Sequence, residues 1–590
     1  MTFYSNQKET FSKELKQLTA RYNIIGTIRF IVAFAFFILV YYKLTSSSNF
    51  YLTVAMIACV AVFLILIKFH TAISKKKIRA AALVNINENE LDYLEAKSIS
   101  FEDGAEFADY KHPYVHDLDI FGSRSLFHNL NRTETYKGKE RLAALLKNIL
   151  PQPDIILNQE AIKELASKPE WRQEIMACGK TNKDSAQSYN KLLGWIEGKV
   201  TSLSQLSAII AYASPVVLLS CLTGYFITDN SVLLSITSYL LLFNIIFMLR
   251  YTRIIKNEIT YTGEIHDIIY RYGQIIEQIE QQHFESKKLI AIQDQLTANN
   301  QKASSHIKKL ALLFSRMDIV NNLFGALLLN SVFLFHYHTL KSLVGWKQKH
   351  AHDLPVWLNA IAEVEALNSL ANFYYNNPDF CFPELNTDFK ISFTDLGHPL
   401  IKKDKRVGNS INFDPAFTIL TGSNMSGKST FLRSLGINMV LSGIGSVVCA
   451  ANAIVHPLPV LVSMRLSDSL SDSESYFFAE IKRLREIMDA LKGGRAFVLL
   501  DEILRGTNSD DKRTGTIKVV KRMIGLNAIG AIATHDIEVC NTSLEYPEIL
   551  INRCFEVQIV DNELYFDYCL RNGICRNKSA TFIMEKMGVV

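Results

Sequence analysis

The stretch Thr421-Gly-Ser-Asn-Met-Ser-Gly-Lys-Ser-Thr430 decides the fold of the C-terminal part of this 590-residue chain. It fits the pattern G-x-x-x-x-G-K-[ST], follows the apolar run Phe417–Leu420 and precedes a predicted helix over Phe431–Leu441. A strand, a glycine-rich loop and a helix in this order form a phosphate-binding loop, because backbone N–H groups and the helix N-terminus attract phosphate. The stretch therefore predicts an α/β nucleotide-binding domain.

The residue types in this loop indicate how a nucleotide would be held. Lys428 is expected to reach the β- and γ-phosphates, and Ser429 is expected to hold Mg²⁺. An incidental lysine in a glycine-rich turn is the alternative interpretation. The expected ATP-binding residues are Gly422, Asn424, Met425, Gly427, Lys428, Ser429 and Thr430.

Two later strands end in polar side chains. Arg495–Glu502 is an apolar strand that closes on two carboxylates, as in a Walker B element. Asp501 is expected to contact Mg²⁺ through water, and Glu502 to polarise the attacking water. His535 follows another short strand, at the strand end where doubly wound sheets bind ligands, so it is a candidate γ-phosphate sensor. A solvated acidic strand end and a structural histidine are the alternatives.

These motifs together resemble the MutS mismatch-repair ATPases. Gly422–Thr430 resembles their G-P-N-M-x-G-K-S-T loop, Asp501–Thr507 their D-E-x-x-R-G-T segment and Thr534-His535 their T-H switch. Ser475, Phe477 and Glu480 match the signature S-x-F-x-x-E. The resemblance implies a homodimer in which the serine end of this signature enters the partner's site, so that ATP lies between two subunits.

The resemblance covers roughly residues 118–200 and 255–590, and the chain departs from it in places. Phe121–Thr135 is similar to the start of the MutS core. The mismatch-reading domain with its Phe-x-Glu wedge is expected to be missing, because the matches at Phe382 and Phe478 lie before and inside the ATPase domain. The dimerisation extension that follows the ATPase domain in many relatives is also expected to be missing. No aromatic residue can be assigned to the adenine.

Two pairs of apolar segments predict transmembrane hairpins. Residues 24–42 and 50–67 flank a short polar linker, and residues 206–227 and 232–249 flank Thr228-Asp-Asn230. Crossing ~30 Å of hydrocarbon takes about 20 apolar residues. Buried core helices are the alternative interpretation.

Basic residues at the outer ends of both hairpins predict the orientation. The two turns contain no lysine or arginine apart from Lys43 at one edge. The positive-inside rule then places both termini and the ATPase in the cytoplasm, on a multi-pass protein of the inner membrane. A further apolar stretch, Ile319–Tyr337, is interpreted as a core helix, because a fifth span would place the ATPase outside. Arg250–Asn299 is interpreted as one long lever helix.

The predicted fold class is an α/β P-loop ATPase domain of the ABC type, preceded by an all-α MutS-like core that carries the two hairpins. Nine cysteines without a C-x-x-C pair indicate a reducing compartment and no structural metal. The net charge of +5 is modest. The predicted domains are 1–80, 81–205, 206–249, 250–385 and 386–590.

Two functions remain open at this point. The first is a membrane-anchored, ATP-dependent DNA-binding protein that acts in mismatch repair or recombination, with ATP and Mg²⁺ as cofactors. The second is a mechanochemical membrane ATPase that uses the same dimer cycle without touching DNA.

Overall fold

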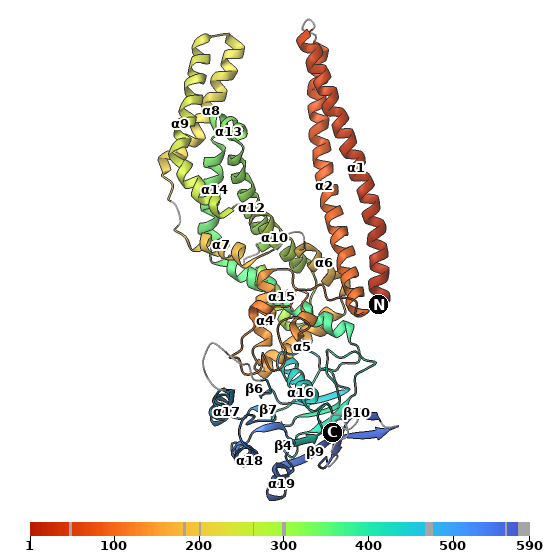
Figure 1. Ribbon diagram of the computed structural model, residues 1–590. Helices are drawn as coiled ribbons and strands as arrows, with labels where there is room; N and C mark the ends of the chain where they lie inside the picture. The colour runs from red at the N-terminus through yellow and green to blue at the C-terminus, as the bar shows by residue number, and fades with distance from the viewer. Residues whose placement is uncertain are drawn as a thin grey trace.

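The computed structural model describes residues 1–45, 50–180, 184–199, 202–262, 265–297, 302–465, 476–560 and 563–575. Helices form one end of an elongated molecule and an α/β domain forms the other (Figure 1). Two long helical hairpins point away from the α/β domain and end at the same side of the molecule.

The first hairpin consists of α1 (Thr2–Thr45) and α2 (Phe50–Leu94). The most apolar 18-residue window of each helix contains no buried residue. The base of α2, in contrast, enters the helical core. There Glu90 and Arg132 form a buried ion pair with 2.5 Å between Oε1 and Nε, and Asn372 Nδ2 donates to Glu90 Oε1 at 3.0 Å. A buried pair broken on one side costs several kcal/mol, so this contact fixes the hairpin to the core.

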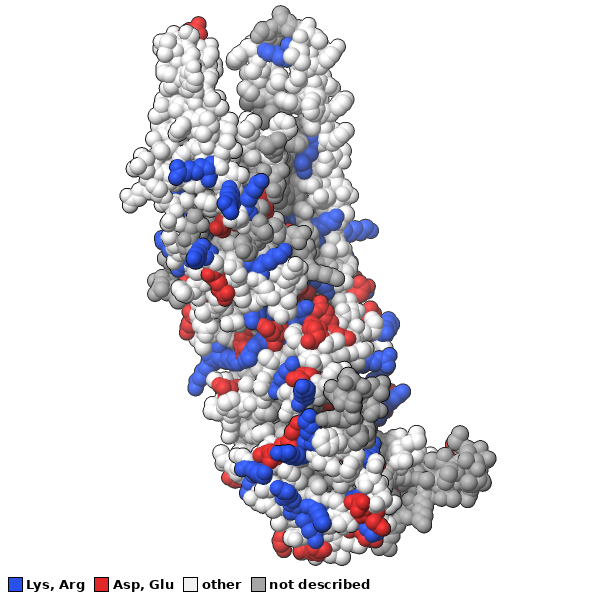
Figure 2. Space-filling model, turned by 60° about the vertical axis from the view of Figure 1, so that its left-hand side comes forward, with Lys and Arg blue, Asp and Glu red and all other residues white. Residues whose placement is uncertain are grey.

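The second hairpin consists of α8 (Gln205–Thr228) and α9 (Ser231–Thr262). Asp229 closes α8 in the left-handed region with φ 53°, and the Asn230 side chain accepts a hydrogen bond from Val232 N at 3.0 Å. Among the described residues, four helices, α1, α2, α8 and α9, are long and apolar enough to cross a membrane. Figure 2 shows the far parts of both hairpins as mostly uncharged, while charged side chains crowd the rest of the visible surface.

The helical core connects the hairpins with the α/β domain. Its last helix, α15, has most of its residues buried and leads directly into the first strands. The helices of this region are η1 (Ala105–Phe107), α3 (Leu126–Leu130), α4 (Tyr136–Leu146), α5 (Gln152–Ala166), α6 (Pro169–Gly179), α7 (Ala186–Glu197), α10 (Ile265–Gln281), α11 (Lys287–Leu296), α12 (Ala303–Met317), η3 (Asp318–Asn321), α13 (Leu323–Phe333), α14 (Phe335–His350) and α15 (Asp353–Asn376).

The expected single lever helix over Arg250–Asn299 is wrong, because the chain turns between α10 and α11. The carboxylate of Glu164 accepts hydrogen bonds from Glu285 N at 3.0 Å and Ser286 N at 2.7 Å. These bonds satisfy backbone donors at the start of α11, where an uninterrupted helix would need none. Glu164, which belongs to α5 and is distant in sequence, thus stabilises the turn that interrupts the predicted helix.

The expected core helix over Ile319–Tyr337 is also wrong for most of its length. The stretch divides into η3, α13 and the start of α14, with Leu334 in the left-handed region at φ 48°. Leu334 and Tyr337 are buried, but the described side chains of α13 are all exposed or half-exposed. The apolar composition predicts a helix here, but it does not predict whether the side chains of that helix are buried by other parts of the protein.

The C-terminal domain contains two sheets. The larger has the order β10-β9-β4-β8-β7-β6, in which all neighbours are parallel except the antiparallel pair β9 and β10. Its strands are β4 (Phe417–Gly422), β6 (Val460–Ser463), β7 (Phe497–Asp501), β8 (Ile529–Ala533), β9 (Leu550–Val560) and β10 (Glu563–Asn572). The smaller sheet has the order β1-β5-β2-β3, from β1 (Glu384–Leu385), β2 (Ser392–Leu396), β3 (Asn409–Asn412) and β5 (Asn452–Val455).

Helices cover both faces of the larger sheet. They are α16 (Lys428–Gly443), α17 (Tyr476–Gly493), α18 (Ser509–Gly525) and α19 (Ile537–Glu545). Alternate side chains of β7 enter two different cores: Leu499 packs in the cluster shared with α16, and Val498 and Leu500 pack in the cluster shared with α17 and α18. Strands buried on both faces are apolar throughout, which explains the unbroken runs in the sequence.

Candidate nucleotide-binding site

The loop between β4 and α16 has the backbone of a phosphate cradle. Gly427 caps α16 with φ 105°, and Met425 also adopts a positive φ of 67°. The positive φ favours glycine at this position, and a Cβ would also crowd the Tyr568 ring, 3.1 Å from its Cδ1. The N-terminus of a 16-residue helix thus opens onto the loop, where its dipole favours an anion.

Lys428 is buried against its own loop. Its ammonium donates to Gly422 O at 2.9 Å and Ser423 O at 3.0 Å. Burial lowers the pKa of this ammonium, while the carboxylates of Glu502 and Asp501 act in the opposite direction. The cation is therefore held where a phosphate could replace the loop carbonyls as its partner.

Glu502 and His535 meet at the ends of neighbouring strands β7 and β8. His535 Nε2 lies 2.6 Å from Glu502 Oε1 and 3.3 Å from Lys428 Nζ. Since one ring nitrogen carries one proton, we assign that proton to the shorter contact with Glu502. The hydrogen bond from His535 lowers the pKa of Glu502 to about 2, and the charge of Arg505 adds to the effect. The sequence prediction that these side chains share one site agrees with this geometry.

Asp501 and Ser429 are suited to a hard cation. Asp501 is buried at the end of β7, and its Oδ1 has no hydrogen-bond partner among the described residues. Ser429 is exposed in the first turn of α16. Carboxylate and hydroxyl oxygens are ligands that Mg²⁺ accepts together with water and phosphate oxygens. The orphaned carboxylate oxygen is the observation that fits the expected Mg²⁺.

The signature segment is described only in part. Ser475 lies outside the described residues, and Phe477 is half-buried against the core between α17 and the sheet. Glu480 is buried and accepts hydrogen bonds from Leu504 N at 2.6 Å and Arg505 N at 3.0 Å. Burial raises the pKa of Glu480, and these two N–H groups oppose that rise. Glu480 therefore orders the segment after Glu502 and does not face the phosphate loop.

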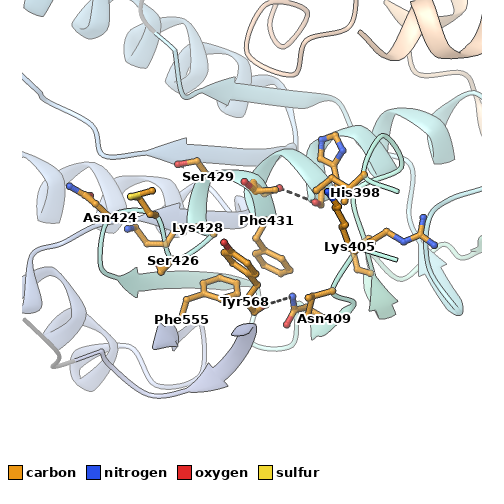
Figure 3. A pocket seen from close by; sticks show the side chains of 18 of the residues that line it. His398, Lys405, Asn409, Asn424, Ser426, Lys428, Ser429, Phe431, Phe555 and Tyr568 are labelled. Carbon is orange, nitrogen blue, oxygen red and sulfur yellow. Dashed lines mark hydrogen bonds between the residues drawn. The ribbon is translucent and has the colours of Figure 1, made fainter. Parts of the chain in front are cut away.

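A pocket of about 530 Å³ opens beside the loop. Figure 3 shows Lys428 and Ser426 on one side, His398 and Lys405 across from them, and Phe431, Phe555 and Tyr568 between. Of these three aromatic residues, Phe431 and Phe555 are buried at 4% and 1% exposure, whereas Tyr568 is 45% exposed. Tyr568 is therefore the one of the three aromatic residues that is accessible to a flat ligand from solvent.

A bulge in β10 presents Tyr568 to this pocket. The register of β9 and β10 shifts between Phe566 and Leu570, and Tyr568 has φ 54°. Asn409 holds the bulge, because its amide donates to Tyr568 O at 3.0 Å and accepts from Leu570 N at 2.6 Å. Sequence reasoning assigned no residue to the base. An aromatic run with two tyrosines was visible there, but the bulge that turns one of them inward was not.

The comparisons with known proteins agree with the motifs. Residues 418–589 match the family MutS domain V. The C-terminal domain of this chain thus belongs to the MutS family. The chain is 26% identical to MutS protein homolog 4 of Homo sapiens over 263 residues, which is 42% of this chain and 28% of that protein. It is 28% identical to the DNA mismatch repair protein MutS of Thermotoga neapolitana over 237 residues, and 30% identical to that of Natronomonas pharaonis over 238 residues.

The matches to these MutS proteins cover 38% and 39% of this chain and 28% and 27% of the two relatives. The chain thus spans less than a third of the length of the curated relatives it matches. The family match begins inside β4 and includes the loop, Asp501, Glu502 and His535. The hairpins α1–α2 and α8–α9 precede the matched family domain.

Proposed function

We propose that this MutS-family protein is a membrane-anchored ATPase that acts as a dimer and binds DNA in an ATP-dependent manner. The observation that carries the ATPase part is the convergence of Lys428, Glu502 and His535 at the mouth of a pocket beside a glycine loop. In this proposal the C-terminal domain has the ABC-type P-loop fold. MgATP binds with its phosphates over α16, Mg²⁺ against Ser429 and Asp501, and the adenine on Tyr568.

The contacts around Lys428 support a change on nucleotide binding. Lys428 donates to two loop carbonyls, and Glu502 accepts a hydrogen bond from His535 and lies 3.5 Å from Arg505. A γ-phosphate offers stronger, charge-assisted bonds to Lys428 and His535. Glu502 would then lose its histidine partner and become free to polarise a water. In the dimer, Ser475 of each subunit would complete the site of the other.

Membrane anchoring rests on the two hairpins. The most apolar windows of α1 and α2 contain no buried residue, and those of α8 and α9 are only 22% and 17% buried. α1 alone exposes Phe30, Phe34 and Phe37. Such a surface is unstable in water and matches lipid. We place the C-terminal domain in the cytoplasm with both termini, on a multi-pass protein of the inner membrane, because the basic residues flank the hairpin bases.

One observation favours the second candidate, a mechanochemical ATPase that does not bind DNA. The segment 251–316 contains nine Lys or Arg against seven Asp or Glu. Several of these cations are also already paired: Lys308 with Glu277, and Lys288 with Glu363 of α15. A DNA-binding groove normally carries a clear excess of free cations.

Salt-dependent DNA binding separates the two candidates. The detergent-solubilised full chain is titrated onto duplex and branched DNA with a non-hydrolysable ATP analogue, at several salt concentrations. We expect binding that weakens steeply with salt, with a log–log slope of about −0.9 for each phosphate contacted. Lys428→Ala should remove the effect of the nucleotide. No binding at low salt would reject the DNA-binding function and leave the mechanochemical one.

A further inference from the structure

The exposed face of α13 is a large apolar surface that the ATPase site does not explain. Phe324 is 84% exposed and Leu328 is 65% exposed, and Leu327 and Phe333 lie on the surface as well. The helix contains no charged residue, and the nearest lysine or arginine on either side along the chain is Arg316 or Lys341. Water is a poor solvent for such a face.

α13 contacts the second hairpin at a defined position along α9. Figure 1 places it beside α8 and α9, at the end of α12 and α14 that points toward the hairpin tips. Asn244 of α9 donates to Ser331 O at 2.7 Å and accepts from Ser214 of α8 at 2.5 Å. The buried Asn244 side chain thus connects α8, α9 and α13 by hydrogen bonds.

The position of Asn244 gives the depth of this unit. Asn244 lies thirteen residues after Ser231, the first residue of α9, which at 1.5 Å per residue is roughly 20 Å below the turn. The hydrocarbon layer is ~30 Å thick. If the turn lies at the far surface of the bilayer, Ser331 lies within the half nearer the cytoplasm. The eleven residues of α13 extend roughly 16 Å, which is too short to span.

Several polar groups at the ends of α13 have hydrogen-bond partners within the protein, which lowers the cost of placing the helix in lipid. The Ser331 hydroxyl donates to Leu328 O at 3.1 Å, and Asn330 Oδ1 accepts from His336 N at 3.0 Å. Asn322 caps the first turn by accepting from Gly325 N at 3.1 Å.

We propose that α13 is embedded in the cytoplasmic half of the bilayer without crossing it, so that its exposed face contacts lipid acyl chains. The inference rests on the proposed membrane anchoring of α8 and α9. Because the chain enters through α12 and leaves through α14 on the same side, α13 adds no crossing and leaves the C-terminal domain in the cytoplasm. The second hairpin and α13 then form a three-helix membrane unit connected to α15 through α14.

Quenching of tryptophan by brominated lipid tests this. Full-length Phe324→Trp and Leu328→Trp variants are reconstituted in vesicles of phosphatidylcholine brominated at positions 6,7 or 11,12 of the acyl chain. Val216→Trp, on the exposed face of α8, is the control for a spanning helix, and Leu544→Trp, on the surface of α19, is the aqueous control. Wild-type protein corrects for the four native tryptophans.

We expect the α13 variants to be quenched at least twofold more than Leu544→Trp, as Val216→Trp is. Quenching of Val216→Trp without quenching of the α13 variants would overturn the inference and leave the membrane anchor intact. That result would also follow if a second copy of the chain covered α13. If Val216→Trp were unquenched as well, the anchoring of the second hairpin would be wrong.

Discussion

Lys428→Ala is expected to weaken MgATP binding by at least about 100-fold. The ammonium is placed to make two charge-assisted bonds to phosphate, each worth roughly 1.5–3 kcal/mol, and 1.4 kcal/mol corresponds to a factor of ten in the dissociation constant. Burial of the cation strengthens the effect, because little water competes at 5% exposure. Equilibrium binding of a fluorescent ATP analogue to the solubilised protein measures the change.

Two variants at Tyr568 serve as controls, because they change the proposed base-binding surface and leave the Lys428 side chain in place. Tyr568→Phe keeps the ring and is expected to bind as the wild type does. Tyr568→Ala removes the stacking surface and is expected to weaken binding about tenfold, since base–aromatic stacking is worth roughly 1–3 kcal/mol. Wild-type affinity in Lys428→Ala would contradict the site. Wild-type affinity in Tyr568→Ala would contradict only the placement of the base.

Glu502→Gln is expected to slow ATP hydrolysis by about 10²–10⁴-fold while ATP binding persists. Glutamine has nearly the same shape but cannot accept a proton from the attacking water. The hydrogen bond from His535 lowers the pKa of Glu502 to about 2, which makes the carboxylate a weak base. Release of His535 to the γ-phosphate would raise that pKa, so we expect the carboxylate to become basic only in the ATP-bound state. Single-turnover hydrolysis measures the chemical step.

The trapped state gives this prediction a second readout. With Glu502→Gln, ATP should remain bound and the dimer should persist, as measured by light scattering of the solubilised protein with MgATP. His535→Asn, which removes the partner of Glu502, should slow turnover less than Glu502→Gln. Turnover of Glu502→Gln at the wild-type rate would mean that another group activates the water.

The motifs of the C-terminal domain could be predicted because their chemistry is local. Glycine at 427, Lys428 and the strand of residues 417–420 lie within about a dozen residues of one another, and backbone sterics fix their arrangement. Asp501, Glu502 and His535 were found for a related reason. Parallel strands bring their carboxyl ends to one edge, so two short apolar runs suffice to place the side chains together.

The residues that the sequence did not reveal depend on contacts between distant segments. Tyr568 enters the pocket because Asn409, 159 residues away, holds the bulge that carries it. The lever helix ends where Glu164 caps α11 from another helix. The apolar stretch Ile319–Tyr337 has the composition of a core helix. Whether its side chains are buried depends on how α12, α14 and α9 pack around it, and these contacts leave one face of α13 exposed. Periodicity identifies a helix and its apolar face, but it does not identify what lies opposite that face.

We propose that the hairpins fix a MutS-type ATPase to the cytoplasmic face of a membrane. ATP hydrolysis by sealed membrane vesicles that contain the chain tests it most directly. We predict Lys428-dependent activity that sediments with the vesicles, is fully expressed in everted vesicles and is latent in right-side-out vesicles until detergent is added. Activity that stays in the supernatant without detergent, or that is equal in both sealed orientations, would contradict the account.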